Sequence, residues 1–176
     1  MSVLSGGTIR LLKILDPHLP RSKHEESGTS FGESMCGYDI RLDQDIVLIP
    51  GRTVLASALE KFDMPLDVVG IVHDKSTWAR RGISVQNTVI EPGWAGFLTL
   101  ELLYSPLISP EETLHITKCL SHRHKPHLHS AHHKDAIILT QGTPIAQVIF
   151  HRIDQLTSGY GEGKYQNQER GPQEAR

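Results

Sequence analysis

The chain has 176 residues and a formal net charge of −2, and 38% of its residues are hydrophobic. This length and composition suit one globular domain with a buried core, and they exclude a disordered chain. A nearly neutral balance provides no basic surface for a long polyanion, so we expect no nucleic-acid partner. Binding of a small anionic ligand is still possible, because local cations rather than net charge determine it.

The sequence contains no features of membrane insertion or secretion. No apolar run approaches the roughly 20 residues that cross a bilayer, and the first 20 residues lack the basic stretch and cleavage site of a signal peptide. Two cysteines, Cys36 and Cys119, are too few for a disulfide framework. We therefore expect no membrane partner and a cytoplasmic location.

Short runs rich in valine, isoleucine, leucine and threonine alternate with proline and glycine along most of the chain. These runs span residues 46–56, 68–72, 82–85, 96–103, 136–142 and 144–153. Their length and the turn residues between them are typical of strands in a sandwich or barrel rather than of a βαβ protein. The pattern therefore predicts a mostly β fold.

Two short helices are expected. The first candidate spans residues 74–82, where Asp74 or Ser76 would cap the start and Gly82 would end the helix. The second spans about residues 7–15, and two prolines just beyond it would stop the helix.

Three other segments are predicted to be loops. Residues 21–36 are polar and rich in glycine and serine, and residues 115–134 hold seven of the eleven histidines. Residues 159–176 have no core pattern and are expected to form a flexible C-terminal lid. We therefore interpret residues 1–176 as a single domain with a histidine-rich insertion at about 105–135.

Six segments, in the correct order, resemble motifs of the dCTP deaminase/dUTPase family. They are GYDIRL (37–42), PGRTVLASALEKFDMPLDVVGIV (50–72), DKSTWARRGISV (74–85), IEPGWAGFLTLEL (90–102), TQGTPIAQVIFHRI (140–153) and GKYQNQERGP (163–172). The resemblance implies a dUTPase-like β-barrel of the β-clip type, with a short helix, that forms a homotrimer. It also implies an enzyme acting on a pyrimidine deoxynucleoside triphosphate, closer to dCTP deaminase than to dUTPase.

Glu101 is the candidate general base. It lies in an apolar segment, 96–103, so we expect both faces of this strand to be buried; the alternative is that Glu101 simply alternates onto a solvent face. dUTPases typically have an aliphatic residue at this position. By resemblance, Glu101 would take a proton from water attacking C4 of cytosine and deliver protons to N3 and the leaving ammonia. Ser76 and Arg80 would hold the water and stabilise developing charge.

A larger set of residues is predicted to bind the nucleotide. Hydroxyls and cations at the start of the 74–82 helix would receive the phosphates, although a plain capped surface helix would have the same sequence. In the C-terminal segment a tyrosine would stack near the nucleotide, while a lysine and a glutamine would close over the phosphates. A frayed chain end would have a similar sequence. The complete predicted set is Lys75, Ser76, Thr77, Arg80, Thr88, Glu91, Thr99, Tyr160, Lys164 and Gln168.

No metal bound by protein side chains is expected to take part in the chemistry. Zinc-dependent deaminases need an H-x-E and a P-C-x-x-C; residues 24–26 mimic the first, but the chain has no C-x-x-C. Mg²⁺ chelated by the triphosphate is the expected cofactor. The insertion offers donors for Zn²⁺ or Ni²⁺, among them His122, His124, His127 and His129. Histidine tracts are often solvated, and we expect no essential metal in this one.

Two departures from the family pattern leave the substrate base open. Glu91 replaces an aspartate that activates water at the α-phosphate in dUTPases, and its longer side chain disfavours that geometry. Between Val85 and Glu91 the chain is about two residues shorter than in deaminases. The expected base of the substrate is therefore cytosine, a 5-substituted cytosine or uracil. The alternatives to a dCTP deaminase are a dUTPase, a bifunctional deaminase-diphosphatase and a catalytically silent nucleotide-binding relative.

Overall fold

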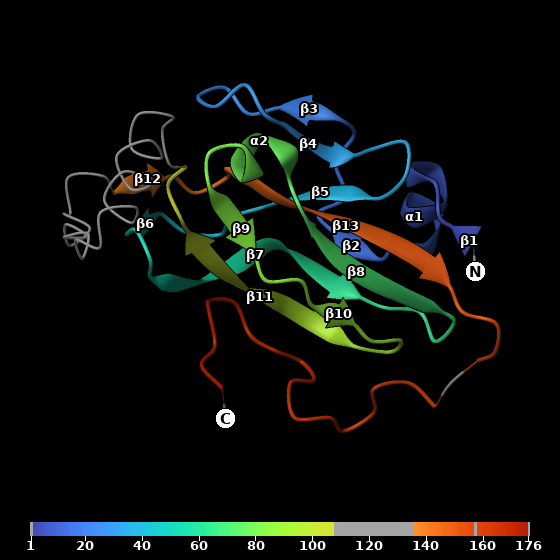
Figure 1. Ribbon diagram of the computed structural model, residues 1–176. Coiled ribbons are helices and arrows are strands. Elements are labelled where there is room, and N and C mark those ends of the chain that lie inside the picture. The colour runs from blue at the N-terminus through green and yellow to red at the C-terminus, as the bar shows by residue number, and fades with distance from the viewer. Residues whose placement is uncertain (1, 108–135, 157, 176) are drawn as a thin grey trace, which may run out of the picture.

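Strands dominate the computed structural model, which describes residues 2–107, 136–156 and 158–175 (Figure 1). The elements are β1 (Ser2–Val3), α1 (Gly6–Leu12), β2 (Leu15–Asp16), β3 (Ser22–Lys23), β4 (Ser30–Glu33), β5 (Tyr38–Arg41), β6 (Ile46–Leu48), β7 (Thr53–Asp63), β8 (Val68–Asp74), α2 (Ser76–Ala79), β9 (Ile83–Val85), β10 (Val89–Ile90), β11 (Ala95–Tyr104), β12 (Ile137–Leu139) and β13 (Pro144–Arg152). Every run predicted to be β contains a strand, so the mostly β prediction is confirmed.

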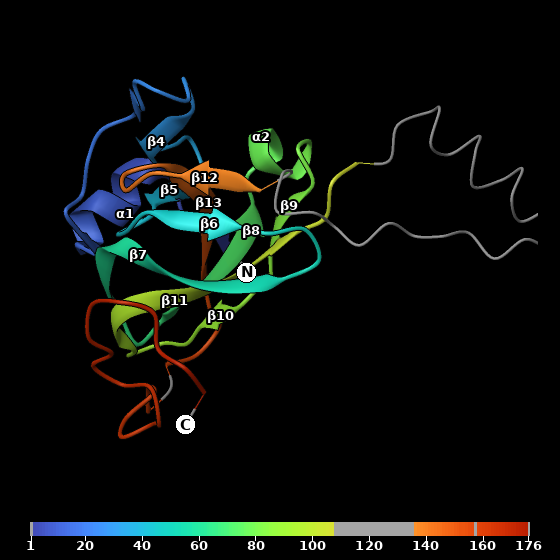
Figure 2. The same ribbon diagram turned by 90° about the vertical axis from the view of Figure 1, so that its left-hand side faces the viewer.

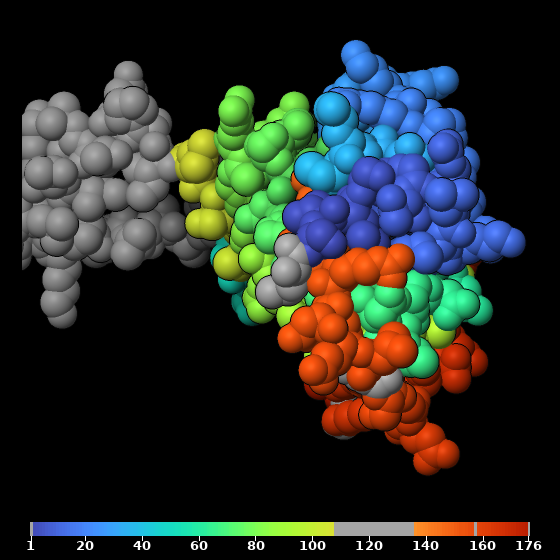
Figure 3. Space-filling view, turned by 90° about the vertical axis from the view of Figure 1, so that its right-hand side faces the viewer, coloured from blue at the N-terminus to red at the C-terminus, as the bar shows by residue number. Residues whose placement is uncertain are grey.

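The strands form two main sheets and one small pair. The larger sheet has the order β10-β8-β13-β5-β4-β3, with β1 also paired to β13, and the second has the order β2-β7-β11-β9. Strands β6 and β12 pair with each other. Figures 1 and 2 show these sheets curling around a common interior. In Figure 3 the dark blue N-terminal segment lies against the orange segment that contains β13, as the pairing of β1 with β13 requires.

Strand β11 is buried on one face only. Its residues alternate between buried and half-buried along all ten positions. Leu98, Leu100 and Leu102 belong to the core, whereas Thr99 and Glu101 lie on the half-buried face. The expectation that both faces are buried is therefore wrong. β11 is antiparallel to β7 and β9, and antiparallel sheets commonly cover only one face with core.

Helix α2 is shorter than predicted and begins differently. Lys75 occupies the N-cap position and makes no side-chain capping bond, so the predicted cap by Asp74 or Ser76 is wrong. The Asp74 carboxylate instead accepts a hydrogen bond from the Val85 amide at 2.7 Å, which ties the strand before the helix to the strand after it. The chain leaves the helix through Gly82, as predicted, with a φ of +81° that favours glycine.

The N-terminal region contains more sheet than its composition indicates. Helix α1 ends at Leu12, after which Lys13 adopts a left-handed conformation, and the next residues pair with β7 as β2. Residues 21–36, predicted to be a loop, contain β3 and β4. β4 pairs with β5, so the polar segment gains its strand conformation from a tertiary partner rather than from its own propensity.

A buried ion pair connects the two main sheets. Glu60 on β7 is fully buried, and Arg41 on β5 donates to it through its backbone amide at 3.0 Å and through Nε at 2.8 Å. Burial raises the pKa of the Glu60 carboxyl, while the hydrogen bonds and charge of Arg41 oppose this shift.

We expect Arg41→Leu to lower the free energy of unfolding at neutral pH by about 3–5 kcal/mol, because it leaves Glu60 buried without a cation. Without the Arg41 side chain the folded-state pKa of Glu60 rises further above its unfolded value of 4.5. The folded state then favours the protonated carboxyl, so the penalty is small below the unfolded pKa and grows as the pH rises. Urea denaturation at about pH 5 and about pH 7.5 measures this.

Arg152→Leu is the matched control. It breaks the Arg152–Asp67 ion pair, whose side chains are 40% and 28% exposed, so the loss should stay below about 1 kcal/mol. An Arg41→Leu penalty that is equally small, or that is independent of pH, would contradict the account of this pair.

Candidate active site

A cavity of about 580 Å³ lies against the half-buried face of β11. Six residues predicted to act on the nucleotide line it: Thr88, Glu91, Thr99, Glu101, Tyr160 and Gln168. Apolar and aromatic side chains form much of the remaining wall, together with three residues near the C-terminus: Leu55, Val89, Ile90, Trp94, Leu98 and Tyr165, then Gln173, Glu174 and Ala175. An apolar cavity with a few convergent polar groups is the usual form of a small-molecule site.

The strand pairing positions Glu101. It lies opposite Leu55 of β7 and two residues from Thr99, and period-two alternation directs both polar side chains to the cavity. The Glu101 backbone carbonyl accepts from the Gln86 amide at 2.9 Å, which holds β11 next to the start of the β9–β10 connection. Toward the described residues the carboxylate makes no hydrogen bond or ion pair, so its oxygens can accept protons from a ligand or water.

The β9–β10 connection forms a second wall. Thr88 is fixed because its carbonyl accepts from the Val72 amide at 3.1 Å, and Val89 and Ile90 then pair with β8 as β10. Glu91 follows at once and is exposed at the cavity. The short connection predicted from the sequence therefore lies at the cavity wall, where its length affects the shape of the site.

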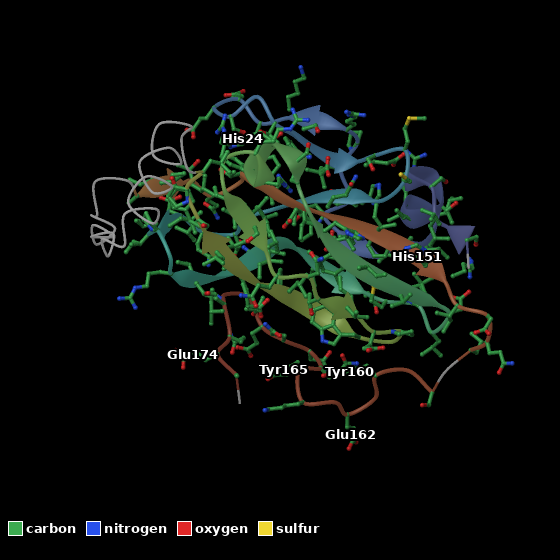
Figure 4. The ribbon with its side chains drawn as sticks, viewed as in Figure 1. His24, His151, Tyr160, Glu162, Tyr165 and Glu174 are labelled. Carbon is green, nitrogen blue, oxygen red and sulfur yellow. The ribbon has the colours of Figure 1, made fainter. Side chains whose placement is uncertain are left out.

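The C-terminal segment, residues 158–175, follows the edge of β11 and closes another side of the cavity (Figure 4). The Asn167 amide donates to Ala95 and the Phe97 amide donates to Gln168, each at 2.9 Å. Figure 4 shows Tyr160 and Tyr165 beside the strands, whereas Glu162 points away from them.

Side chains anchor the same segment to the cavity. Trp94 donates through Nε1 to the Tyr165 carbonyl at 2.7 Å. The Thr99 hydroxyl accepts from the Gln168 side-chain amide and from the Gln173 backbone amide. Thr99 is therefore shared by the C-terminal segment and the pocket, which explains why it lines the cavity but is already hydrogen-bonded. Opening of this segment as a lid stays a prediction.

Glycine allows the segment to approach β11. A Cβ on Gly96 would lie 2.7 Å from the Gln168 amide nitrogen and 2.9 Å from its carbonyl oxygen, both backbone atoms. Gly96 also has a φ of +144°, which side chains rarely adopt. A larger residue here is incompatible with the observed docking.

The remaining predicted residues do not line this cavity. Ser76, Thr77 and Arg80 are not among the residues that line the cavity, and Figures 1 and 2 show α2 at the end of the molecule opposite the C-terminal segment. Ser76 and Arg80 are exposed, and toward the described residues Arg80 makes no ion pair. Lys75 instead forms an ion pair with Asp39. Lys164 is exposed, and its ammonium lies 5.4 Å from the centre of the Tyr165 ring.

Sequence reasoning missed several residues of the cavity, including Trp94, Tyr165 and Gln173. The sequence did contain a sign of two of them. Trp94 and Tyr165 are aromatic residues inside two of the family motifs, and they lie among turn and polar residues, where binding residues are common.

The histidine-rich insertion, with the candidate ligands His122, His124, His127 and His129, lies outside the described residues. Within residues 2–107, 136–156 and 158–175 no group of three or more potential ligands from histidine, cysteine, aspartate and glutamate comes together. Over the same ranges no helix is long and apolar enough to cross a membrane.

Sequence comparisons identify the family. The sequence profile of the dCTP deaminase-like family matches residues 14–105, which is more than half of the chain. The dCTP deaminase of Anaplasma phagocytophilum (strain HZ) is 32% identical over 133 residues, covering 57% of this chain and 72% of that protein. The dCTP deaminase of Ehrlichia canis (strain Jake) is 35% identical over 119 residues, covering 51% of this chain and 63% of that protein.

The chain therefore belongs to the dCTP deaminase-like family. Its match spans less than two thirds of the length of the Ehrlichia canis relative.

Solved structures support the fold. The 2'-deoxycytidine 5'-triphosphate deaminase of Agrobacterium tumefaciens superposes with a TM-score of 0.54 at 16% identity, covering 86% of this chain and 48% of that chain. The dUTPase of Staphylococcus phage phi11 superposes with a TM-score of 0.51 at 14% identity, covering 81% and 88%, and that protein coordinates a structural Mg(II) ion. The predicted dUTPase-like fold class is confirmed by these likenesses.

We expect Gly96→Ala to release the C-terminal segment from β11, because the new methyl group meets the Gln168 backbone. Trypsin should then cleave after Lys164 faster than in the wild-type protein, and the amides of Phe97 and Asn167 should exchange faster with solvent. Gly161→Ala is the control: Gly161 also has a positive φ, of +60°, but a Cβ there has no atom within 4 Å. Equal cleavage rates in both variants would contradict the observed docking.

Proposed function

We propose that the chain is a dCTP deaminase that converts dCTP and water to dUTP and ammonia. The observation that carries the proposal is the position of Glu101, whose carboxylate lines a nucleotide-sized cavity beside Thr99 and Trp94 and has no partner among the described residues. Family membership and the dCTP deaminase relatives support the same reaction. The aromatic and apolar wall suits a base, and the polar groups suit its edge and the sugar.

In this proposal Glu101 is the general base. It takes a proton from a water molecule, whose oxygen attacks C4 of cytosine while the C4–N3 double bond opens, and it passes that proton to N3. Glu101 then takes the remaining proton from the new C4 hydroxyl and delivers it to the 4-amino group. The bond between C4 and this amino nitrogen breaks, ammonia leaves, and the oxygen stays on C4 as the carbonyl of uracil. Thr88 and Glu91 would contact the base and sugar, and Tyr160 would stack near them.

A neighbouring copy of the chain would supply the phosphate contacts. Ser76, Thr77 and Arg80 do not line the cavity of their own subunit, so in this proposal they contact a nucleotide bound in another subunit's cavity. A homotrimer with its sites at the subunit interfaces provides this arrangement. Arg80 would stabilise the phosphates and the developing charge, and Ser76 would hold the attacking water.

The C-terminal segment would complete the site. Gln168 already lines the cavity, and Lys164, four residues before it, would reach the phosphates when the segment closes over a ligand. Mg²⁺ would arrive as part of the substrate, chelated by the triphosphate oxygens.

A second candidate is hydrolysis of dUTP, alone or after deamination. The exposed Glu91 carboxylate at the cavity supports it, because a carboxylate there could activate water for attack on the α-phosphate, although its side chain is longer than the aspartate of dUTPases. Products separate the candidates: a deaminase releases ammonia and keeps the triphosphate, a diphosphatase releases pyrophosphate, and a bifunctional enzyme releases both. A catalytically silent relative would bind nucleotide without changing it.

We expect Glu101→Gln to lower kcat by at least about a hundredfold, because it keeps the size of the side chain and removes the base. Nucleotide affinity should survive, since the cavity wall is unchanged. Glu162→Gln is the matched control, because Glu162 points away from the strands and should not affect turnover (Figure 4). Ammonia release and calorimetric binding measure both effects, and near-normal turnover by Glu101→Gln would assign the chemistry to another residue.

We also expect two inactive variants to restore activity in mixed trimers. Glu101→Gln and Arg80→Ala damage different parts of the site, so a mixed trimer contains interfaces that combine an intact Glu101 with an intact Arg80. With equal amounts and random assembly, about one site in four is complete in a cyclic trimer. Co-expressed mixtures should therefore regain about a quarter of wild-type turnover, and mixed trimers purified by two tags should regain about a third. Mixtures as inactive as the parents would contradict the shared site.

A further inference from the structure

Lys75 forms a shielded ion pair at the start of α2. Its ammonium nitrogen lies 2.7 Å from Oδ2 of Asp39, and the two side chains are only 11% and 8% exposed. Ser30 joins the pair: its hydroxyl donates to Asp39 at 3.4 Å and accepts from Lys75 at 3.5 Å. The three residues come from β4, β5 and the residue before α2, so the contact joins the large sheet to the helix.

The helix needs this external support. α2 spans only Ser76–Ala79, and one helical turn is unstable by itself because nucleation fixes several residues for few hydrogen bonds. Lys75 at the N-cap cannot accept a hydrogen bond from the first amides, since an ammonium is only a donor. Tertiary contacts must therefore hold the turn, and one such contact is the bond from the Trp78 indole to the Pro144 carbonyl.

We propose that Asp39 is a positioning residue that acts through Lys75. By holding the Lys75 ammonium, Asp39 fixes the turn that presents Ser76 and Arg80. It also keeps Lys75 from the substrate phosphates, so Lys75 serves the site as an anchor rather than as a phosphate ligand. The functional part of this inference rests on the proposed role of α2 in triphosphate binding, whereas the anchoring of α2 stands on the contacts alone.

The two roles of Lys75 predict opposite effects of removing Asp39. If Lys75 binds phosphate, Asp39 competes with the substrate, and Asp39→Asn lowers KM by freeing the ammonium. If Lys75 is an anchor, Asp39→Asn and Lys75→Met each loosen α2 and both are harmful. Both variants break the same contact, the Lys75–Asp39 ion pair. Their effects are therefore not additive, and the double variant is no worse than either single variant.

The test measures these three variants in the full-length protein. Amide exchange of residues 76–82 without nucleotide should rise by a similar factor in Asp39→Asn, Lys75→Met and the double variant. Turnover of dCTP should fall by about tenfold or more in all three, since small displacements of positioned groups cost this much. Lys75→Arg keeps the cation and should retain most of the activity. The double variant leaves no unpaired buried charge, so it remains informative if a single variant folds poorly.

Asp67→Asn is the control, because it breaks the ion pair of Asp67 with Arg152, which lies outside α2 and the cavity. It should change neither exchange of α2 nor turnover. Unchanged exchange of residues 76–82 in Asp39→Asn, a lower KM in that variant, or fully additive losses would overturn the inference. If the wild-type protein turns over no pyrimidine nucleotide, the proposed function fails, while the exchange measurement still decides the anchoring.

Discussion

The alternation of side chains along β11 organises the candidate site. Leu100 and Leu102 bury one face of this strand in the core, which fixes its register against β7 and β9 from Thr99 onward. Since a shift of one residue would exchange the two faces, the same packing holds Thr99 and Glu101 at the cavity. The hydrophobic core and the position of the candidate base are therefore consequences of one register.

The edge of β11 has a second partner in the C-terminal segment. Backbone hydrogen bonds join Ala95 and Phe97 to Asn167 and Gln168, so a wall of the cavity comes from residues about 70 positions later in the chain. Side-chain hydrogen bonds to Trp94 and Thr99 add to these backbone bonds. The segment lies outside the two main sheets, and such a segment opens at a lower free energy than the core does. In the proposed function this wall would admit a triphosphate and then exclude water.

The proposed site has two parts. In the proposal the nucleobase and the general base Glu101 occupy the cavity along β11, whereas α2 at the other end of a neighbouring subunit would contact the phosphates. α2 is short, and two contacts hold it: Lys75 to Asp39 and Trp78 to Pro144. The bond from the Val85 amide to Asp74 also ties the strands on either side of the helix. A site assembled between subunits needs this kind of rigidity, because neither half alone positions the nucleotide.

The sequence predicted the strands well, because aliphatic runs indicate buried segments and the glycines and prolines between them indicate turns. It did not predict β3 and β4, whose residues are polar and become strands through pairing with β5. Glu101, Thr99 and Gln168, which the motifs singled out, line one cavity, and their roles there stay predictions. They did not indicate that Lys75 pairs with Asp39, because an ion pair between residues 36 positions apart depends on tertiary structure that no local pattern encodes.

The central claim is that water attacks C4 of a cytosine base, and the fate of its oxygen tests this directly. Wild-type protein incubated with dCTP and Mg²⁺ in ¹⁸O-labelled water should yield dUTP with an intact triphosphate and one ¹⁸O atom on the base. Mass spectrometry of the product and its fragments locates the label. A label found instead in the phosphate of a nucleoside monophosphate or in pyrophosphate, with an unlabelled base, would contradict deamination as the reaction of this site.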